Sequence, residues 1–440
     1  MMRRAAAQIA PTLPVSGNTI GASSSPASRP GIRARGKTCA SVARGTIARM
    51  SDEPLHLVDA TMFWSPTGGG VRRYLQTKHA WLAAQPRWRH TIAVPRVAGA
   101  SAEAATLPSW PLPASGGYRL PLRRGAIARV LAGLRPDLIE AGDPYRVAWS
   151  ALDAARARDI PTLAYCHSNI VAMARLAAGP FAGVAARAAE RYARHVYRGF
   201  DLVLAPSRSM ASELEAWGVG RVACQPLGVD TDVFHPNARD AAWRQRYGWS
   251  DATRVLVYAG RFAAEKHLDV VAAAVERLGA PYVLVAIGAG PAPPPASHRV
   301  VVVPFVAAAR GLATALASAD AFVHAGDQET FGLSALEAMA CATPAVLRLR
   351  AGLAELCDDE GAIGVNEGSA SAFAEAIAAL FAGDRARRAR AARARAEASD
   401  WRRVFPALVA HYQRLLGARG GLAANAAAGR ATNATTALGR

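Results

Sequence analysis

The sequence predicts an α/β protein built from two doubly wound domains, each a parallel sheet flanked by helices. From residue 55 onward, short β-branched runs alternate with longer stretches of helical periodicity, which is typical of βαβ units. The alternation comes in two consecutive series of about 170 and about 150 residues, each the size of one domain. No apolar stretch approaches the ~20 residues that a membrane-spanning helix needs, so we predict no such helix.

The first series opens directly after the polar segment that starts at Met50. Its expected strands are Leu55–Ala60, Thr91–Pro95, Asp137–Ala141, Thr162–Cys166 and Leu202–Ala205. Its expected helices include Val71–Ala84 and Ala172–Tyr197, which carry apolar residues at helical spacing.

The second series follows a connecting segment near Gln225–Pro236, where we expect the two domains to join. Its expected strands are Val255–Ala259, Tyr282–Ile287, Val300–Pro304, Ala321–Ala325 and Ala345–Leu347. Its expected helices lie near residues 266–278, 309–318 and 332–342. Residues 384–396 have arginine on nearly every side, typical of a solvated surface helix, and Trp401–Leu416 regains an amphipathic pattern.

The net charge of +19 lies almost entirely at the two ends of the chain. Residues 1–50 and 384–440 carry 17 of these charges, which leaves +2 for the middle. A nucleic-acid-binding domain would carry its basic residues on the folded body, so a nucleic-acid partner is disfavoured. We interpret residues 1–50 as a disordered leader, or as sequence upstream of a true start at Met50, and residues 417–440 as a disordered tail.

The five cysteines are scattered along the chain and form no metal-binding pattern. Cys39, Cys166, Cys224, Cys341 and Cys357 include no C-x-x-C pair and show no metal-ligand spacing with histidine. An odd number of scattered cysteines is typical of reduced thiols in a cytosolic protein. We therefore expect a cytoplasmic protein without a bound metal.

Residues after the strands deserve most weight, because ligands of doubly wound sheets bind beyond the carboxyl ends of the strands. After the first strand, Gly68, Gly69 and Gly70 precede a helix expected to start near Val71. Glycine lets the backbone approach a ligand, and N–H groups at a helix start favour anions. A tight turn explains the same glycines equally well.

A cationic pair follows the first strand of the second series. Gly260 and Arg261 end this strand, and Lys266 lies five residues beyond Arg261. Arginine and lysine at such a place suit a diphosphate, although a surface ion pair with Glu265 is the alternative. Gly288 ends the next strand, where a simple turn is a competing explanation.

Two glutamates follow the strand at 321–325, eight residues apart. Glu329 falls in the loop and Glu337 falls inside the next helix, near its apolar side. A carboxylate is costly to bury unless it is paired or bound to a ligand. Two such acceptors reaching into one cleft suit a ligand with several hydroxyl groups, and solvent exposure of either is the alternative.

The segment around these glutamates, ETFGLSALEAMACATPAV, resembles the signature of glycosyltransferase family 4, the retaining, nucleotide-sugar-dependent enzymes of the GT-B fold. The accompanying motifs, in the order that this family shows, are Gly68–Gly70, Pro206-Ser207, Leu227-Gly-Val-Asp230, Gly260-Arg261 and Glu265-Lys266. The resemblance covers residues 55–416. It implies two Rossmann-like domains facing across a cleft: an acceptor domain at 51–226, a donor domain at 227–396, and a terminal helix at 397–416 that crosses back onto the first domain.

The resemblance also implies roles for matching positions. Glu329 would face the reacting sugar, Glu337 would bind the ribose hydroxyls, and Arg261 and Lys266 would neutralise the departing diphosphate. His167, at the end of the strand Thr162–Cys166, matches an active-site histidine of the family, although a lone histidine there is often structural. The other expected donor contacts are Gly68, Gly69, Gly70, Gly260, Gly288, Phe331, Gly332 and Leu333.

Two departures from the family pattern put local loop geometry in question. Ala342 stands where the family usually has glycine before Thr-Pro, and Ala351-Gly352 stands where it usually has two glycines. Asp230-Thr-Asp232 mimics the metal-binding motif of a different transferase fold, and we interpret it as structural.

The resemblance implies a retaining hexosyltransferase, mannosyl or glucosyl, that uses a nucleoside-diphosphate sugar and no metal cofactor. The acceptor would be a glycan, a lipid-linked sugar or a small molecule, with Asp143, Tyr145 and Arg146 on the acceptor side. One alternative is a related sugar-nucleotide epimerase or phosphorylase. Another is a non-catalytic protein that lies on membranes through the arginine-rich stretch 172–200, which could equally be a solvated helix face.

Overall fold

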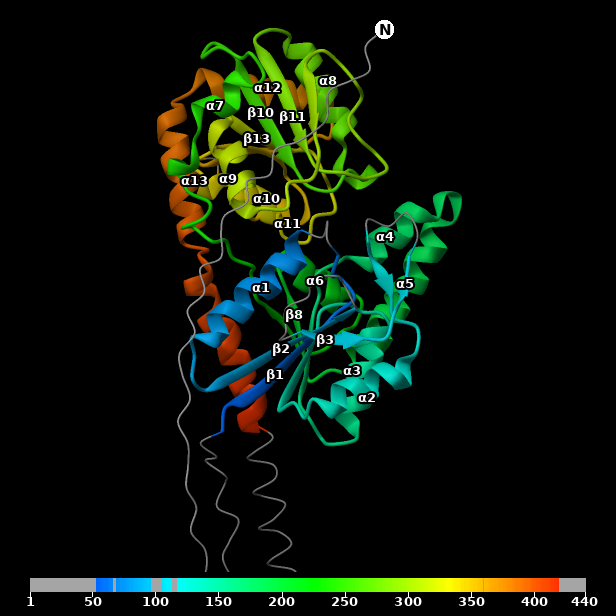
Figure 1. Ribbon diagram of the computed structural model, residues 1–440. Coiled ribbons are helices and arrows are strands. Elements are labelled where there is room, and N and C mark those ends of the chain that lie inside the picture. Colours follow the sequence, from blue (N-terminus) through cyan, green and yellow to red (C-terminus); the bar gives the residue numbers. More distant parts are fainter. Residues whose placement is uncertain (1–52, 66–68, 96–103, 113–116, 359, 419–440) are drawn as a thin grey trace, which may run out of the picture. The chain divides into compact units, whose positions relative to one another are not determined.

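The computed structural model describes residues 53–65, 69–95, 104–112, 117–358 and 360–418, all within one compact unit. It contains two parallel sheets with helices, which confirms the predicted α/β class with two Rossmann-like domains (Figure 1). The expected leader at 1–50 lies outside the described residues. So does the expected tail, except for residues 417 and 418, which are helical.

The first domain is built on a seven-stranded sheet of order β3-β2-β1-β6-β7-β8-β9. Its strands are β1 (Leu55–Ala60), β2 (Trp88–Pro95), β3 (Ala104–Leu107), β6 (Leu138–Ala141), β7 (Thr162–Tyr165), β8 (Leu202–Ala205) and β9 (Val222–Cys224). Its helices are α1 (Gly70–Ala83), α2 (Arg124–Gly133), α3 (Arg146–Arg156), α4 (Ile170–Ala177), α5 (Ala182–Tyr197) and α6 (Arg208–Ala216). A separate antiparallel pair consists of β4 (Trp110–Pro111) and β5 (Arg119–Leu120).

The second domain is built on a six-stranded sheet of order β12-β11-β10-β13-β14-β15. Its strands are β10 (Arg254–Ala259), β11 (Tyr282–Ile287), β12 (Val300–Val303), β13 (Ala321–His324), β14 (Ala345–Arg348) and β15 (Ala362–Val365). Its helices are α7 (Ala241–Gln245), α8 (Leu268–Leu278), α9 (Ala309–Ser318), α10 (Leu333–Ala340), α11 (Ala351–Ala354), α12 (Ala370–Ala382) and α13 (Arg385–Glu397).

Alternating side chains of the strands bury both faces of each sheet. In β1, Leu57 packs into the cluster that includes α1, whereas Val58 packs into the cluster that includes α2 and α3. In β10, Val257 packs into the cluster that includes α9 and α10, whereas Leu256 packs into the cluster that includes α8 and α12 on the other face. Parallel sheets need this cover on both faces.

The strand order reverses between β1 and β6 in one sheet and between β10 and β13 in the other. At such a point the connections leave in opposite directions, so a crevice opens beyond the carboxyl ends of the two strands. The loops after β1, β6, β10 and β13 are therefore the places where a ligand is expected.

The expected helix Ala172–Tyr197 was wrong, because the chain forms two helices there. Helix α4 ends before Gly179, whose φ of +50° lies in the left-handed region, and Pro180 then supplies no backbone N–H. A short 3₁₀ turn at Gly179–Phe181 leads into α5. Strands β3, β4, β5, β9 and β15 were not predicted.

The expectation that residues 384–396 form a wholly solvated surface helix was also wrong. In α13, Ala392 and Ala396 are fully buried. The Arg393 guanidinium donates to the backbone oxygens of Phe234, at 2.9 Å, and Ala340, at 2.6 Å. One side of this arginine-rich helix therefore fastens the domain connection to α10.

The chain passes between the domains twice, and the two passages run side by side. Val229 donates to the Ser399 oxygen and accepts from the Trp401 N–H, at 3.0 and 3.1 Å. A Cβ on Gly228 would lie 2.7 Å from the Trp401 ring, so only glycine fits this approach. Residues 401–418 then form a helix, drawn in red beside α1 in Figure 1.

A buried polar cluster holds that last helix against the first domain. The Lys78 ammonium contacts the Asp59 carboxylate at 2.7 Å, the Glu140 carboxylate at 3.1 Å and the Tyr412 hydroxyl at 2.9 Å. The Tyr412 hydroxyl also donates to Glu140, at 2.5 Å. Because each buried charge has a partner, the cluster fixes the docking of the helix without an isolated charge in the core.

Candidate active site

Lys266 and Glu329 meet at the point where the strand order of the six-stranded sheet reverses. Lys266 follows β10 and Glu329 follows β13, and the ammonium lies 2.6 Å from Glu329 Oε1. Both side chains are largely buried. The sequence predicted this pair at one crevice, and the structure brings the two groups into direct contact.

His324 completes this cluster, and sequence analysis did not single it out. Its Nδ1 accepts from the Gly326 N–H at 2.9 Å, so the ring proton lies on Nε2, which donates to Glu329 Oε1 at 3.0 Å. Burial lowers the pKa of His324 and keeps the ring neutral. A polar residue at the end of the apolar strand β13 was the signal that could have identified it.

Glu329 stays ionised because of these neighbours. Burial alone would raise the pKa of this carboxyl, but the Lys266 charge and the His324 hydrogen bond lower it below its usual value. An anionic oxygen is thus held firmly in place, and its second oxygen can accept from a ligand hydroxyl.

Arg261 lies on the exposed side of the same loop. Its side chain is 62% exposed, and its guanidinium contacts Glu265 at 2.8 Å. The ion pair with Glu265, foreseen as the alternative, therefore exists in this structure. Glu265 also lies 4.0 Å from the Lys266 ammonium, so the two cations share one carboxylate.

Gly260 and Gly288 allow the loops after β10 and β11 to touch. A Cβ on Gly288 would overlap the backbone oxygen of Gly260, and one on Gly290 would overlap that of Phe262. These glycines are therefore needed for close backbone approach, which is more specific than the simple turn considered from sequence.

Glu337 is covered by the first domain. Its carboxylate, 2% exposed, forms an ion pair with the Arg73 guanidinium of α1. Burial lowers the pKa of Arg73 to about 10, and the group stays charged at neutral pH. Arg73 also lies over the Phe234 ring, with 5.4 Å between guanidinium carbon and ring centroid. A ribose can take both oxygens of Glu337 only if Arg73 moves.

The glycine-rich start of α1 lies against the start of α10. A Cβ on Gly70 would be 3.5 Å from Leu333 Cδ2, whereas Gly69 has open space around it. Gly68 lies outside the described residues. Gly332 has a φ of +98°, which favours glycine, and the Phe331 side chain is buried in the core. A ligand would therefore meet Phe331 through its backbone.

His167 faces the second domain from the end of β7. Its backbone oxygen accepts from the Thr330 hydroxyl at 3.2 Å, one residue beyond Glu329. Its ring stacks on Tyr165, with 4.3 Å between centroids. Burial lowers the pKa of His167 to about 3, so the ring is neutral, and its Nε2 has no partner among the described residues. A buried unpartnered nitrogen is a natural contact for a ligand.

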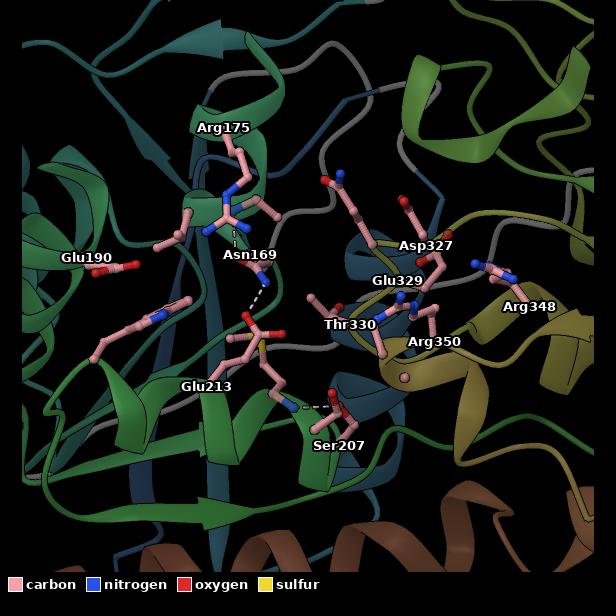
Figure 2. Close-up of a pocket in the computed structure, with 18 residues that line it drawn as sticks. Asn169, Arg175, Glu190, Ser207, Glu213, Asp327, Glu329, Thr330, Arg348 and Arg350 are labelled. Carbon is pink, nitrogen blue, oxygen red and sulfur yellow. Dashed lines mark hydrogen bonds between the residues drawn. The ribbon is translucent and has the colours of Figure 1, made fainter. Parts of the chain in front are cut away.

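A cavity of about 550 Å³ lies beside Glu329 and Thr330, and both domains line it. Figure 2 shows Asp327, Glu329 and Thr330 on one side, and Asn169 with Glu213, joined by a 2.6 Å hydrogen bond, on the other. We name it the polar cavity. Its size and convergent polar groups are those of a small-molecule site.

The two departures from the family pattern keep the loop conformation that glycine would give. Ala342 and Ala351 have φ values of +57° and +48°, in the left-handed region. Next to Ala351, the Gly352 N–H donates to the backbone oxygen of Glu329 at 2.8 Å. A Cβ on Gly352 would lie 2.5 Å from the Phe331 nitrogen. The missing glycines therefore strain the backbone without displacing the Glu329 loop.

The Asp230-Thr-Asp232 segment is structural, as interpreted from sequence. The Asp230 carboxylate accepts from the N–H groups of Asp232 and Val233, at 3.1 and 3.0 Å, and Asp232 pairs with Arg402. Among the residues that the structure describes, no three His, Cys, Asp or Glu side chains cluster as metal ligands would.

Two family models match the chain, one for each domain. The model described as Glycosyltransferase Family 4 matches residues 68–233, and the model described as Glycosyl transferases group 1 matches residues 253–383. The second match contains Lys266, Glu329 and Glu337.

Curated relatives align over most of the chain. A GDP-mannose-dependent alpha-(1-6)-phosphatidylinositol dimannoside mannosyltransferase of Mycobacterium tuberculosis is 32% identical, over 81% of this chain and 95% of the relative. A GDP-mannose-dependent alpha-mannosyltransferase of Mycolicibacterium smegmatis is 33% identical, over 71% of this chain and 83% of the relative.

Solved structures share the fold at low sequence identity. Sucrose-phosphate synthase of Thermosynechococcus elongatus superposes with a TM-score of 0.68 at 20% identity, covering 83% of this chain and all of that one. Anabaena Alr3699/HepE in complex with UDP-glucose gives 0.61 at 17% identity, with coverage of 83% and 100%.

Proposed function

Because the chain belongs to glycosyltransferase family 4, we propose that it transfers mannose from GDP-mannose to a hydroxyl of a glycolipid acceptor, with retention of the α configuration. The enzyme class, nucleotide-sugar-dependent glycosyl transfer, follows from the family. The donor and the acceptor are proposals, supported by relatives of 32% and 33% identity that use GDP-mannose, one of them on a phosphatidylinositol dimannoside.

The contact of Lys266 with Glu329 is the observation that carries the proposed chemistry. Lys266 would stabilise the departing diphosphate while Glu329 accepts from hydroxyls of the sugar. The bond from sugar carbon to diphosphate oxygen breaks with its electron pair on the diphosphate. The acceptor oxygen then bonds to the same face of that carbon and releases its proton to the departing diphosphate.

The charges at the site limit how the diphosphate can bind. Arg261 and Lys266 carry two positive charges, and Glu265 and Glu329 carry two negative ones, so the cluster is neutral. We infer that backbone N–H groups at the start of α1, at Gly69 and Gly70, supply the remaining attraction. Glu337 would bind the ribose hydroxyls after Arg73 has moved away.

His167 would contact the acceptor or the donor sugar. Its ring is neutral, so it can donate or accept one hydrogen bond through Nε2 without bringing a charge. The Thr330 bond to its backbone oxygen ties this contact to the Glu329 loop. This scheme contains no metal: Arg261 and Lys266 face the departing diphosphate, and backbone N–H groups supply the attraction that the pairing of these cations with Glu265 and Glu329 offsets.

We propose that the protein works at the cytoplasmic membrane face, held there by α4 and α5. Arg187 and Arg191 of α5, and Arg198 directly after its end, recur at helical spacing next to exposed Phe181 and Val184. A basic stripe beside exposed apolar side chains suits an anionic lipid surface. Among the described residues, no helix has the length and apolarity of a membrane span.

Nucleotide binding and product analysis test the donor and the reaction. GDP at 100 times its dissociation constant should stabilise the protein by about 2.7 kcal/mol in thermal unfolding, more than UDP or ADP does at the same concentration. Octyl α-mannoside should become mannosylated, with an α linkage by NMR and GDP released only when acceptor is present. Stabilisation by UDP alone, or GDP release without acceptor, would contradict the proposal.

Vesicle sedimentation tests the membrane contact. Wild type should sediment with phosphatidylglycerol vesicles and remain in solution with phosphatidylcholine vesicles. Replacing Arg187, Arg191 and Arg198 by serine should abolish the difference, whereas Arg277→Ser, on an exposed position of α8, should not. Unchanged sedimentation of the triple variant would remove α5 from the proposed surface.

A further inference from the structure

A second pocket lies in the first domain, outside the polar cavity. It has a volume of about 530 Å³, and its walls come from the loop after β1, the hairpin strand β5 and helices α2, α3 and α5. The residues that line it are Met62, Leu120, Arg124, Tyr145, Arg146, Trp149 and Tyr192. We name it the apolar pocket.

Trp149 and Tyr192 offer their ring faces to this pocket, because their polar atoms are already bonded. Trp149 Nε1 donates to the Tyr192 hydroxyl at 3.3 Å, and that hydroxyl donates to the Pro144 oxygen at 2.8 Å. The Arg124 guanidinium lies over the Trp149 ring, and two of its nitrogens donate to the Asp153 carboxylate, at 2.5 and 2.6 Å. A sugar would find few partners for its hydroxyls here, so the walls suit an apolar ligand.

The pocket opens at the sheet edge that carries His167. Met62 and Tyr145 follow β1 and β6, the two strands between which the order reverses. Both are held by Asp143, whose carboxylate accepts from their N–H groups at 2.7 and 3.0 Å. In the same loop, a Cβ on Gly142 would lie 3.5 Å from His167 Cδ2. A molecule in the pocket would therefore lie beside the residue that we place at the reacting groups.

Exposed apolar side chains continue the walls of the pocket outward. Trp110, 60% exposed, pairs with Leu120 across the hairpin, and Leu122 is exposed two residues further on. Helix α5 gives Tyr192 to the pocket and carries exposed Val184 two turns earlier. Exposed apolar groups gathered in this way mark a binding surface.

Arg146 supplies a charge at the exposed side of the pocket. Its guanidinium pairs with no carboxylate in the described part of the chain, unlike that of Arg124. An unpaired arginine beside apolar walls matches a molecule with an apolar chain and an anionic group, which is the chemistry of an acidic lipid.

We propose that the apolar pocket holds one acyl chain of the acceptor lipid, with Arg146 beside the anionic headgroup. This inference rests on the proposed transfer to a glycolipid and assigns the residues that would recognise the lipid part. It separates recognition of a single lipid molecule from attachment to the bilayer through α4 and α5.

Binding of alkyl α-mannosides of different chain length tests the pocket without any donor. Each buried methylene contributes about 0.8 kcal/mol, or roughly fourfold in affinity. Butyl and octyl α-mannoside differ by four methylenes, so titration calorimetry below micelle formation should show octyl binding at least about tenfold tighter to wild type. Trp149→Ala should reduce this ratio to below about twofold, because the wall of the pocket is lost.

Two further variants keep the test decisive if Trp149→Ala fails to fold. Leu120→Asp, on the hairpin wall, should remove the chain-length dependence, whereas Val302→Ala, an exposed apolar position on β12 of the second domain, should keep it. Equal affinity of wild type for butyl and octyl α-mannoside would overturn the proposal, as would a chain-length dependence that survives both pocket variants. Failure of mannosyl transfer would refute the proposed function and leave this binding test unaffected.

Discussion

The ion pair of Arg73 with Glu337 occupies the carboxylate that we assign to the donor ribose. Replacing Arg73 by methionine keeps an unbranched apolar side chain and removes the charge. An exposed pair contributes up to about 1 kcal/mol and a fully buried one costs about 3–5 kcal/mol to break. With 20% and 2% of the two side chains exposed, this pair falls between these limits, at about 1–2 kcal/mol. Because the donor must displace Arg73, we expect its loss to tighten GDP binding by a factor of about 5–30.

Titration calorimetry with GDP measures this effect directly. Wild type, Arg73→Met and Arg73→Lys should be compared, since lysine keeps the charge and should remain close to wild type. Circular dichroism should show that all three proteins are folded. Weaker GDP binding by Arg73→Met than by wild type would refute the reasoning, because Arg73 would then assist the nucleotide instead of competing with it.

Three more predictions concern pH, backbone strain and metal ions. Burial, then the Asp59 charge, raises the pKa of Glu140 to about 7. Protonation of Glu140 therefore stabilises the folded protein, and this contribution is lost as pH rises from about 4.3 to about 7. The melting temperature of wild type, minus that of Glu140→Gln, should fall across pH 5–8. A constant difference would contradict this. Ala342→Gly should stabilise the protein by about 0.5–1 kcal/mol in urea unfolding, because φ is +57° there, whereas Ala394→Gly, inside α13, should destabilise it by a similar amount; a destabilising Ala342→Gly would refute the strain argument. EDTA should leave kcat within about twofold, because the proposed scheme stabilises the diphosphate through Lys266, Arg261 and backbone N–H groups; loss of activity that Mg²⁺ restores would show that a metal is required.

The sequence was sufficient for the parts of the fold that local pattern determines. Strands such as β8 and β11 have apolar runs bounded by polar, proline or glycine residues, so their limits could be read from the chain. The break between α4 and α5 depends on one Gly-Pro step, which the arginine-rich periodicity on both sides concealed. The buried side of α13 was hidden because its alanines are too small to stand out among the arginines.

The site was predictable where a residue directly follows a strand. Glu329 and Lys266 could be expected at one crevice, since carboxyl ends of neighbouring parallel strands meet at the same edge. The partner of Glu337 could not be predicted, because Arg73 lies 264 positions away in the chain and reaches Glu337 only through the packing of α1 against α10. The apolar pocket likewise depends on side chains of five separate elements.

Turnover by Lys266→Ala, with GDP-mannose and octyl α-mannoside at saturation, tests the central assignment most directly. Arg277→Ala, which removes an exposed cation of α8, serves as the matched control. We predict that Lys266→Ala loses roughly 10²–10³ in kcat, like the loss of one donor to a developing negative charge, and that Arg277→Ala keeps wild-type turnover. Near-normal kcat in a folded Lys266→Ala protein would mean that the Lys266 ammonium, placed beside Glu329, does not stabilise the departing diphosphate.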